Sequence, residues 1–405
     1  MTDIYEVSFN PFAPGFTDDP YPQYAALRTA VPAYEHALGF WFLSRYSDVQ
    51  ALLRSNASVD LNNLGPGRYR EMTEQLYGEV MTPRLGGLSM LDRDAPDHTR
   101  LRRLVTKAFT PRAVAGLEAK IRSLVDGKLD EIGRAGRGDV VADLAFPLPF
   151  EVISELLGMP ETDHYRVREL SGVLARSFEP GVAPEAMREI VAADTELAEI
   201  IGEVVAWKRE HPADDLMSEL IVAEDEGDVL SDAELVAQVE LIYLAGYHNT
   251  VNMIANGVHA LLRHPDQLKL LRQDPALIDN AVDELMRFDT PTQFLRRITL
   301  DSYRVGNVKL EPGSFVLLSI GSANRDETFW GATADTVIVD RENARAHLSF
   351  GAGSRFCLGS ALARMEAKAA IGGLVHRFPD LAADGGVRWN GRINLRGPEF
   401  LPISV

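Results

Sequence analysis

Apolar residues recur at intervals of three and four positions through much of the chain. This spacing places them on one face of a helix, so it indicates helices rather than strands. The four clearest segments are 114–133, 150–158, 183–208 and 231–263. We therefore expect a mainly α architecture.

The last of these segments has the strongest signals. Ser231 is followed three residues later by Glu234, the pattern of a capping box, and the helical spacing continues to the neighbourhood of Pro265. At about 1.5 Å per residue such a helix is roughly 50 Å long. Its middle, 235–260, is apolar over most of its circumference, so we expect it to be largely buried.

The pattern changes in the last third of the chain. A shorter helix follows Asp274-Pro275 and must end before Pro291. Alternation with turn residues indicates short strands over 298–320 and again over 392–405. The expected order is helices first, then a small β region, then a glycine-rich loop and one more helix.

Composition limits what these elements can form. The chain has 405 residues, 46% of them hydrophobic and 25% charged, which is typical of a globular protein. No linker, repeat or low-complexity tract interrupts it, so we expect one domain over 1–405. The first residues lack the leader of a secreted protein, and no segment has the roughly twenty apolar residues of a membrane span. A cytoplasmic protein without membrane contact is expected.

Charge and cysteine content exclude several function classes. The net charge of −18 argues against nucleic-acid binding. In contrast to this negative net charge, residues 100–112 include five basic residues and no acidic one. The segment is either a solvated helix face or a docking patch for an acidic partner. The single cysteine excludes disulfide frameworks and metal sites built from several thiolates.

That cysteine lies in an unusual segment, HLSFGAGSRFCLGSALARMEAK. Three glycines at 351, 353 and 359 bracket Cys357, and a helical pattern begins directly after it. The N–H groups and dipole of a helix start favour a thiolate, which can be a metal ligand or a nucleophile. An inert core cysteine is the alternative, but it needs neither a flexible loop nor the adjacent Arg355. A nucleophile paired with a histidine stays open.

Five residues of this segment carry a resemblance to a known family. Phe350, Gly353, Arg355, Cys357 and Gly359 match the haem-binding loop of cytochrome P450, F-x-x-G-x-R-x-C-x-G, at every defined position. The chain resembles the soluble bacterial class of these haem-thiolate monooxygenases over nearly its whole length. The resemblance implies a triangular helical prism with a small β region, haem b (iron protoporphyrin IX) as cofactor and Cys357 as the ligand of its iron.

Further motifs extend the resemblance. Glu284 and Arg287 match the structural E-x-x-R pair, and 94–102 resembles D-x-P-x-H-x-x-x-R, whose histidine and arginine bind haem propionates. Arginine suits this role because its fork donates two hydrogen bonds to a carboxylate. The resemblance assigns the cofactor site to His98, Arg102, Ala245, Gly246, Arg297, His347, Phe350, Gly351, Arg355, Cys357 and Gly359.

The long helix departs from the family at its centre. In LAGYHNTVN, His248 occupies the position of an acid and Asn249 that of a threonine, with Thr250 next. An amide is a very poor proton shuttle. His248 could replace the acid, Thr250 could act if the helix bulges, or a substrate hydroxyl could hold the necessary water; alternatively, His248 points away and ordered water suffices. A milder departure is the missing proline and phenylalanine in 329–341.

By resemblance, the expected activity is the oxidation of a hydrophobic small molecule, such as a polyketide, terpenoid or steroid-like compound, using O2. Electrons would come from a ferredoxin and its reductase, docked through Arg103, Lys107 and Arg112. Two alternatives are a haem protein that does not oxygenate and an enzyme of peroxide-driven or oxidative-coupling type. Family position places the following residues, each of which could equally be ordinary core, around the substrate: Met90, Leu91, Ile242, Ala245, Thr292, Phe294, Ile393 and Asn394.

Overall fold

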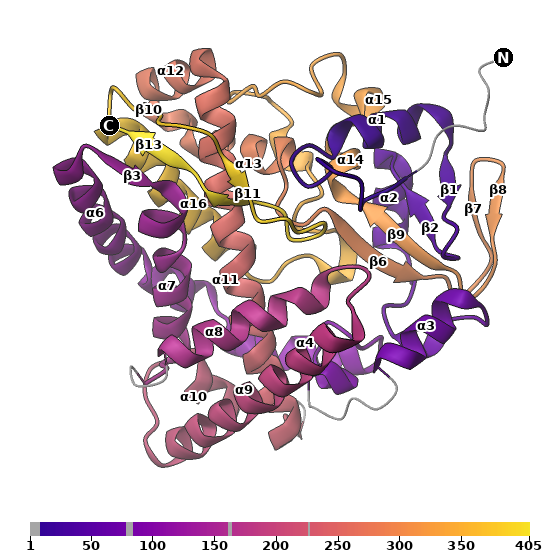
Figure 1. The fold of residues 1–405 in the computed structure, drawn as a ribbon. Helices are drawn as coiled ribbons and strands as arrows, with labels where there is room; N and C mark the ends of the chain where they lie inside the picture. The colour runs from indigo at the N-terminus through magenta and orange to yellow at the C-terminus, as the bar shows by residue number, and fades with distance from the viewer. Residues whose placement is uncertain (1–8, 78–83, 161–163, 226) are drawn as a thin grey trace.

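The structure, a computed structural model, describes residues 9–77, 84–160, 164–225 and 227–405, and Figure 1 shows that helices dominate them. The expectation of a mainly α fold is confirmed. The helices are α1 Tyr21–Ala30, α2 Tyr46–Arg54, α3 Arg68–Tyr77, α4 Asp97–Ala108, α5 Pro111–Gly116, α6 Glu118–Ala135, α7 Pro147–Leu157, α8 His164–Leu174, α9 Pro184–Glu210, α10 Leu216–Val222, α11 Asp232–Arg263, α12 Pro265–Gln273, α13 Ile278–Phe288, α14 Ile320–Ala323, α15 Glu327–Trp330 and α16 Ser360–Arg377.

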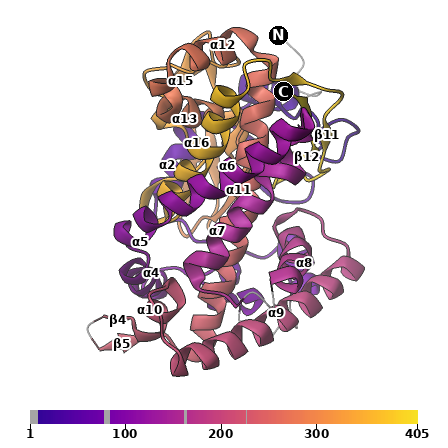
Figure 2. The same cartoon turned by 90° about the vertical axis from the view of Figure 1, so that its left-hand side faces the viewer.

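Helix α11 is the axis of the molecule. The Ser231 side chain accepts from the backbone N–H of Glu234, and the Glu234 carboxylate accepts from the Ser231 N–H, so the predicted capping box is present. The helix has 32 residues and is therefore about 48 Å long. It runs through the interior in Figure 2 and packs against α7, α9, α13 and α16. The site described below lies along this helix.

A four-stranded sheet brings residues 33–43 together with residues 294–319. Its order is β1 (Ala33–Glu35), β2 (Trp41–Leu43), β9 (Phe315–Ser319), β6 (Phe294–Ile298), and the β2–β9 pair is parallel while the other two pairs are antiparallel. The expected order, with helices first and strands later, therefore misses the two strands β1 and β2 near the N-terminus. Strands β1 and β2 have only three residues each, too few for a clear alternation.

Among the described residues, the remaining strands form one three-stranded sheet and three two-stranded sheets. The predicted strands over 298–320 correspond to β7, β8 and β9, and those over 392–405 to β12 and β13. The remaining bounds are β3 Arg137–Asp139, β4 Glu224–Asp225, β5 Asp228–Val229, β7 Tyr303–Val305, β8 Val308–Leu310, β10 Ala382–Ala383, β11 Arg388–Trp389, β12 Pro398–Phe400 and β13 Pro402–Ser404.

Two apolar clusters matter for the site. The larger one surrounds α11 and includes α6, α7, α9, α13 and α16. A smaller aromatic cluster packs the N-terminal segment on the sheet and contains Phe9, Tyr24, Phe42 and Phe294. Across the described parts of the chain, no helix is both long and apolar enough to cross a membrane.

Candidate functional site

The loop before α16 has a fixed and unusual path. Gly351 and Gly353 adopt φ values of 72° and 71°, a left-handed conformation that glycine tolerates best. A Cβ on Gly353 would lie 3.2 Å from the Cα of Arg54, so the loop presses against α2. The backbone N–H of Cys357 donates to the Phe350 carbonyl over 2.9 Å and closes the loop. These contacts hold Cys357 at the start of α16.

The thiol of Cys357 is both surrounded and accessible. Burial raises its pKa, and the N–H of Gly359 together with Arg102 and Arg364 only partly offset that rise. The predicted support from the helix start is present in Gly359, but burial outweighs it. Nevertheless Cys357 is an exposed residue. A side chain that protein surrounds and solvent still reaches borders a hollow inside the fold.

The segment before α4 closes one side of this hollow. The backbone N–H of Met90 donates to Oε1 of Gln238 on α11 over 3.0 Å, and the Met90 carbonyl accepts from Arg355 Nη1 over 3.3 Å. Arg355 also pairs with Asp94 at 3.0 Å. Residues 90–94 therefore connect α11 directly to the cysteine loop.

Strand β6 closes the opposite side. The Thr292 hydroxyl donates to Asn249 Oδ1 on α11 over 2.8 Å. Three residues later, Leu295 Cδ1 lies 3.8 Å from the position that a Cβ on Gly351 would take. The chain thus forms a ring from α11 through β6 to the cysteine loop and back through 90–94.

Ala245 marks where α11 faces the interior of this ring. It is exposed, whereas the four residues before it are buried. We infer that Ala245 and Cys357 border the same hollow from opposite sides. Gly246, also predicted at the cofactor, faces elsewhere: a Cβ there would lie 3.1 Å from Ile153 Cδ1 of α7. Its small size is needed for packing between helices, and its role at the cofactor stays a prediction.

One histidine and three arginines, His98, Arg102, Arg297 and Arg355, gather beside the cysteine loop. Burial lowers the pKa of His98 to about 4, with further lowering by Arg355 and Arg102. Arg297 is 5% exposed, and burial followed by Arg355 lowers its pKa to about 10. Within the described residues Arg297 has no carboxylate partner, and its guanidinium donates to the Arg296 carbonyl over 2.7 Å.

Such a cluster requires an anion. Buried charges are normally paired, and these cations destabilise one another. Asp94, the nearby acid, is already paired with Arg355. The donors therefore fit the two carboxylates of a haem, with Cys357 available to its iron.

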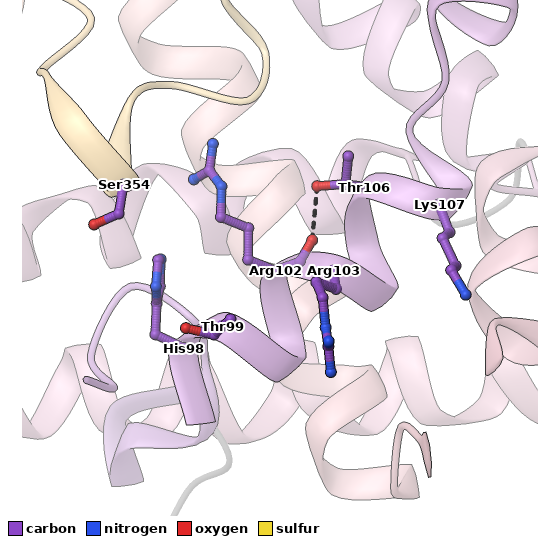
Figure 3. A pocket seen from close by; sticks show the side chains of 7 residues that line it. All are labelled: His98, Thr99, Arg102, Arg103, Thr106, Lys107 and Ser354. Carbon is purple, nitrogen blue, oxygen red and sulfur yellow. Dashed lines mark hydrogen bonds between the residues drawn. The ribbon is translucent and has the colours of Figure 1, made fainter. Parts of the chain in front are cut away.

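Helix α4 presents part of this cluster to an open cavity of about 430 Å³. Figure 3 shows His98 and Arg102 on one turn of α4 and Ser354 of the cysteine loop across from them. The Arg102 Nη2 donates to the Phe356 carbonyl over 2.6 Å. The lining residues are His98, Thr99, Arg102, Arg103, Thr106, Lys107 and Ser354.

The basic patch therefore adjoins the cysteine loop. Arg103 and Lys107 are exposed on α4, and Lys107 Nζ donates to the Glu224 carbonyl over 2.8 Å. Arg112 is exposed on α5 and does not line the cavity.

The role predicted for His347 is wrong. Its Nε2 bonds Asp283 Oδ1 at 3.1 Å, and its Nδ1 accepts from the Ser349 N–H at 3.1 Å. No ring nitrogen remains for a propionate. Burial alone would raise the pKa of Asp283, but hydrogen bonds from His347 and Arg364 outweigh it and lower that pKa. His347 therefore helps to stabilise the ionised Asp283 carboxylate.

Three predicted pocket residues also face elsewhere. Phe294 and Ile393 pack in the aromatic cluster of the N-terminal segment. The Asn394 side chain accepts from the Phe294 N–H over 2.9 Å and donates to the Phe178 carbonyl over 3.0 Å. Because side chains alternate along a strand, Leu295 shares the face of Arg297 and replaces Phe294 toward the ring. The alternation was the signal that sequence reasoning missed.

The altered centre of α11 does not form a proton relay around His248. Its Nε2 lies 3.0 Å from the Ser171 carbonyl and must donate to it. Burial, and then Arg392, lower the His248 pKa to about 4, so the ring is neutral near pH 7. The Thr250 hydroxyl donates to the Gly246 carbonyl over 3.0 Å. His248 as a replacement acid is therefore wrong, and its ring is directed toward α8.

Glu284 and Arg287 form the predicted structural pair. Both are fully buried, with contacts of 2.7 and 2.9 Å between them. Arg341 Nε completes the group at 3.0 Å from Glu284 Oε2, a partner that sequence reasoning did not assign. Arg287 also donates to the carbonyls of Ala334 and Thr336, which fixes the path of 329–341.

The other pocket candidates keep positions compatible with the prediction. Met90 and Leu91 lie in the segment that closes the ring, and Leu91 is 41% exposed. Ile242 is three residues before Ala245 and so shares its face of α11. Thr292 is part of the ring, because its hydroxyl donates to Asn249 of α11.

Comparisons with known proteins agree with this arrangement. The family model described as Cytochrome P450 matches residues 184–381. Cytochrome P450 107B1 of Saccharopolyspora erythraea is 39% identical, covering 97% of this chain and 96% of the relative. The vitamin D(3) 25-hydroxylase of Pseudonocardia autotrophica is 39% identical, with coverage of 97% and 96%. The structure of the bacillaene polyketide synthase cytochrome P450 PksS of Bacillus subtilis superposes with a TM-score of 0.87 at 32% identity, covering 98% and 99%.

Proposed function

Because the chain belongs to the cytochrome P450 family of haem-dependent monooxygenases, we propose that Cys357 binds the haem iron and that the enzyme oxidises a hydrophobic small molecule in the hollow below α11. One observation carries this proposal. Cys357 is enclosed by protein yet exposed, on the opposite side of a closed ring from the exposed Ala245. A thiolate at that position can bind the iron of a flat cofactor that lies within the ring.

The cations beside the loop would hold the rest of the cofactor. His98, Arg102, Arg297 and Arg355 would pair with the haem propionates, while Phe350, Gly351 and Gly359 shape the loop. When bound, the haem supplies O2 activation at a thiolate-ligated iron. The chain contributes a site whose two sides are joined by direct hydrogen bonds to α11.

The substrate proposal rests on the lining and on the relatives. Met90, Leu91, Ile242 and Ala245 present mainly apolar surface, which suits a polyketide, terpenoid or steroid-like molecule. The names of two relatives, a vitamin D(3) hydroxylase and a polyketide synthase cytochrome P450, concern such compounds. We place the enzyme in secondary metabolism on this basis.

We propose a ferredoxin as the electron donor. Arg103 and Lys107 line the rim of the cavity that Ser354 shares, three residues before Cys357, and Arg112 extends the patch. Their charge would attract an acidic partner, although the chain as a whole carries a net charge of −18.

The altered residues His248 and Asn249 favour a second candidate function, that of a peroxide-driven or non-oxygenating haem protein. Substrate-dependent consumption of NAD(P)H with a matching amount of product separates the two.

Replacing Cys357 tests the central assignment. Cys357→Ser should abolish the red-shifted Soret band of the ferrous carbon monoxide adduct, because that shift requires a thiolate. Ser354→Ala, a change in the same loop, should keep the band. Survival of the red-shifted band in Cys357→Ser would show that another group binds the iron.

Two broader expectations also remain proposals. A single domain over 1–405 is supported by the sheet that pairs β1 and β2 with β6 and β9. The cytoplasmic location stays a prediction.

A further inference from the structure

One end of the Asn249 amide is held by a neighbour. The Thr292 hydroxyl donates to Asn249 Oδ1 over 2.8 Å, from a residue just before β6. This contact fixes the rotation of the amide, because its oxygen must point toward Thr292. The amide nitrogen, Nδ2, therefore points away from β6.

The amide nitrogen of Asn249 is not fully enclosed by the protein. Within the described chain no group accepts a hydrogen bond from Asn249 Nδ2, and this atom is not among the enclosed polar atoms that lack a partner. It is therefore accessible, although α11 is buried over most of its length. Asn249 lies four residues after Ala245, so both share one face of the helix. That face borders the hollow.

We propose that Asn249 is a substrate-recognition residue whose Nδ2 donates a hydrogen bond to an oxygen of the substrate, so the enzyme selects hydrophobic molecules that carry a carbonyl or ether oxygen near α11. This inference rests on the proposed function. It also gives Asn249 a role other than proton transfer, for which an amide is poorly suited.

The physical reason for selectivity is the cost of an unpaired donor. When a purely hydrocarbon ligand displaces water from the hollow, the Asn249 N–H groups lose their partners, and an enclosed donor without a partner is costly. A ligand oxygen restores the bond. A site that offers a fixed donor therefore discriminates more sharply against a ligand lacking the acceptor than an apolar wall does. Thr292 contributes by keeping the donor aimed.

Matched pairs of probes test the proposal in the haem-loaded protein. Cyclododecanone is compared with cyclododecane, and 5α-androstan-17-one with 5α-androstane, by equilibrium dialysis. The measured quantity is the ratio of the ketone Kd to the hydrocarbon Kd, because this ratio cancels general effects on the hollow. The variants are Asn249→Ala, Asn249→Asp and Thr292→Val.

We expect Asn249→Ala to shift this ratio against the ketone by about threefold to tenfold in at least one pair, the range for one hydrogen bond. Asn249→Asp should shift it similarly, because an ionised carboxylate keeps the size and the acceptor for Thr292 but donates nothing. Thr292→Val should give a smaller shift in the same direction. In Asn249→Ala the hydrocarbon Kd should stay the same or tighten, because no donor is left to lose its partner, whereas a general loss of structure would weaken hydrocarbon binding.

An unchanged ratio in Asn249→Ala for both pairs overturns the proposal, as does a failure of the wild-type protein to retain either ketone. The ferrous carbon monoxide spectrum of each preparation separates this failure from that of the proposed function. A normal red-shifted band with an unchanged ratio overturns only the role of Asn249. An absent band in the wild-type protein contradicts the haem-thiolate assignment itself.

Discussion

The Nε2 of His248 lies 3.0 Å from the carbonyl oxygen of Ser171, so this histidine ties α11 to α8. Its ring is neutral near pH 7, because burial and Arg392 lower its pKa to about 4. The bond requires the proton to stay on Nε2. His248 is therefore a link between two helices at the position where the family has an acid.

This link predicts acid sensitivity. The unfolded chain binds a proton at His248 below about pH 6.5, whereas the folded protein does so only near 4, so stability falls as the pH falls through that window. Between about pH 7 and about pH 5 the loss from this group is on the order of 2 kcal/mol. Urea unfolding at both values should show that His248→Gln, which keeps a donor for Ser171, loses less stability than the wild type. Equal losses would contradict the neutral buried state.

The pair of Glu284 and Arg287 should dominate the stability of its region. Within the described residues, Arg287→Leu leaves Arg341 as the one charged partner of the buried Glu284 carboxylate. Breaking such a buried pair typically costs about 3 to 5 kcal/mol. Denaturant unfolding provides the measurement. Arg122→Ala removes an exposed pair with Glu118 and should cost less than about 1 kcal/mol. Similar losses in the two variants would show that the buried pair carries no special weight.

Arg297 should contribute to cofactor retention more than its neighbour Arg296. Among the residues that the structure describes, no carboxylate pairs with the buried Arg297, whereas Arg296 already pairs with Asp92 at 2.7 Å. Charged hydrogen bonds contribute about 1.5 to 3 kcal/mol, so Arg297→Leu should speed haem transfer to apomyoglobin by at least about tenfold. Arg296→Leu is the control, with a smaller effect. A faster loss from the Arg296 variant would remove Arg297 from the propionate site.

The basic patch should control the rate of reduction. Arg103→Glu combined with Arg112→Glu should slow reduction by an acidic ferredoxin severalfold at low salt, because steering depends on complementary charge. The difference should shrink as salt screens the charges. Stopped-flow reduction measures the rate, and substrate Kd should not change. Rates that stay at the wild-type level in low salt would place the docking site elsewhere.

The sequence was sufficient where function depends on local spacing. The Cys357 loop and the Glu284–Arg287 pair are each set by residues within one short segment, and α11 shows its capping box at Ser231. Errors arose where the partner comes from far along the chain. His347 meets Asp283, 64 residues away, and Asn394 meets Phe294, 100 residues away. Neither contact leaves a mark in the local pattern.

Strand β6 shows a second kind of error. A shift by one position exchanged Phe294 for Leu295, because a strand changes face at every residue. The same strand holds Arg297, which lies beside Arg355 of the cysteine loop and shows which positions of β6 share that face. The prediction that His248 replaces the acid was wrong for a third reason. The ordinary pKa of histidine indicates a proton donor near neutral pH, and only the packing of α8 over His248 reverses that expectation.

The ring around the hollow has a consequence for the order in which the protein is made. Arg355 reaches back 265 residues to the Met90 carbonyl, and Gly353 rests on α2. During synthesis on a ribosome, the N-terminal half of the ring must wait until nearly the whole chain has emerged before the loop with Cys357 can close it. The cofactor can therefore be captured only at the end of translation, and a nascent chain stalled before residue 350 would expose His98 and Arg297 without the ligand that they are arranged to hold.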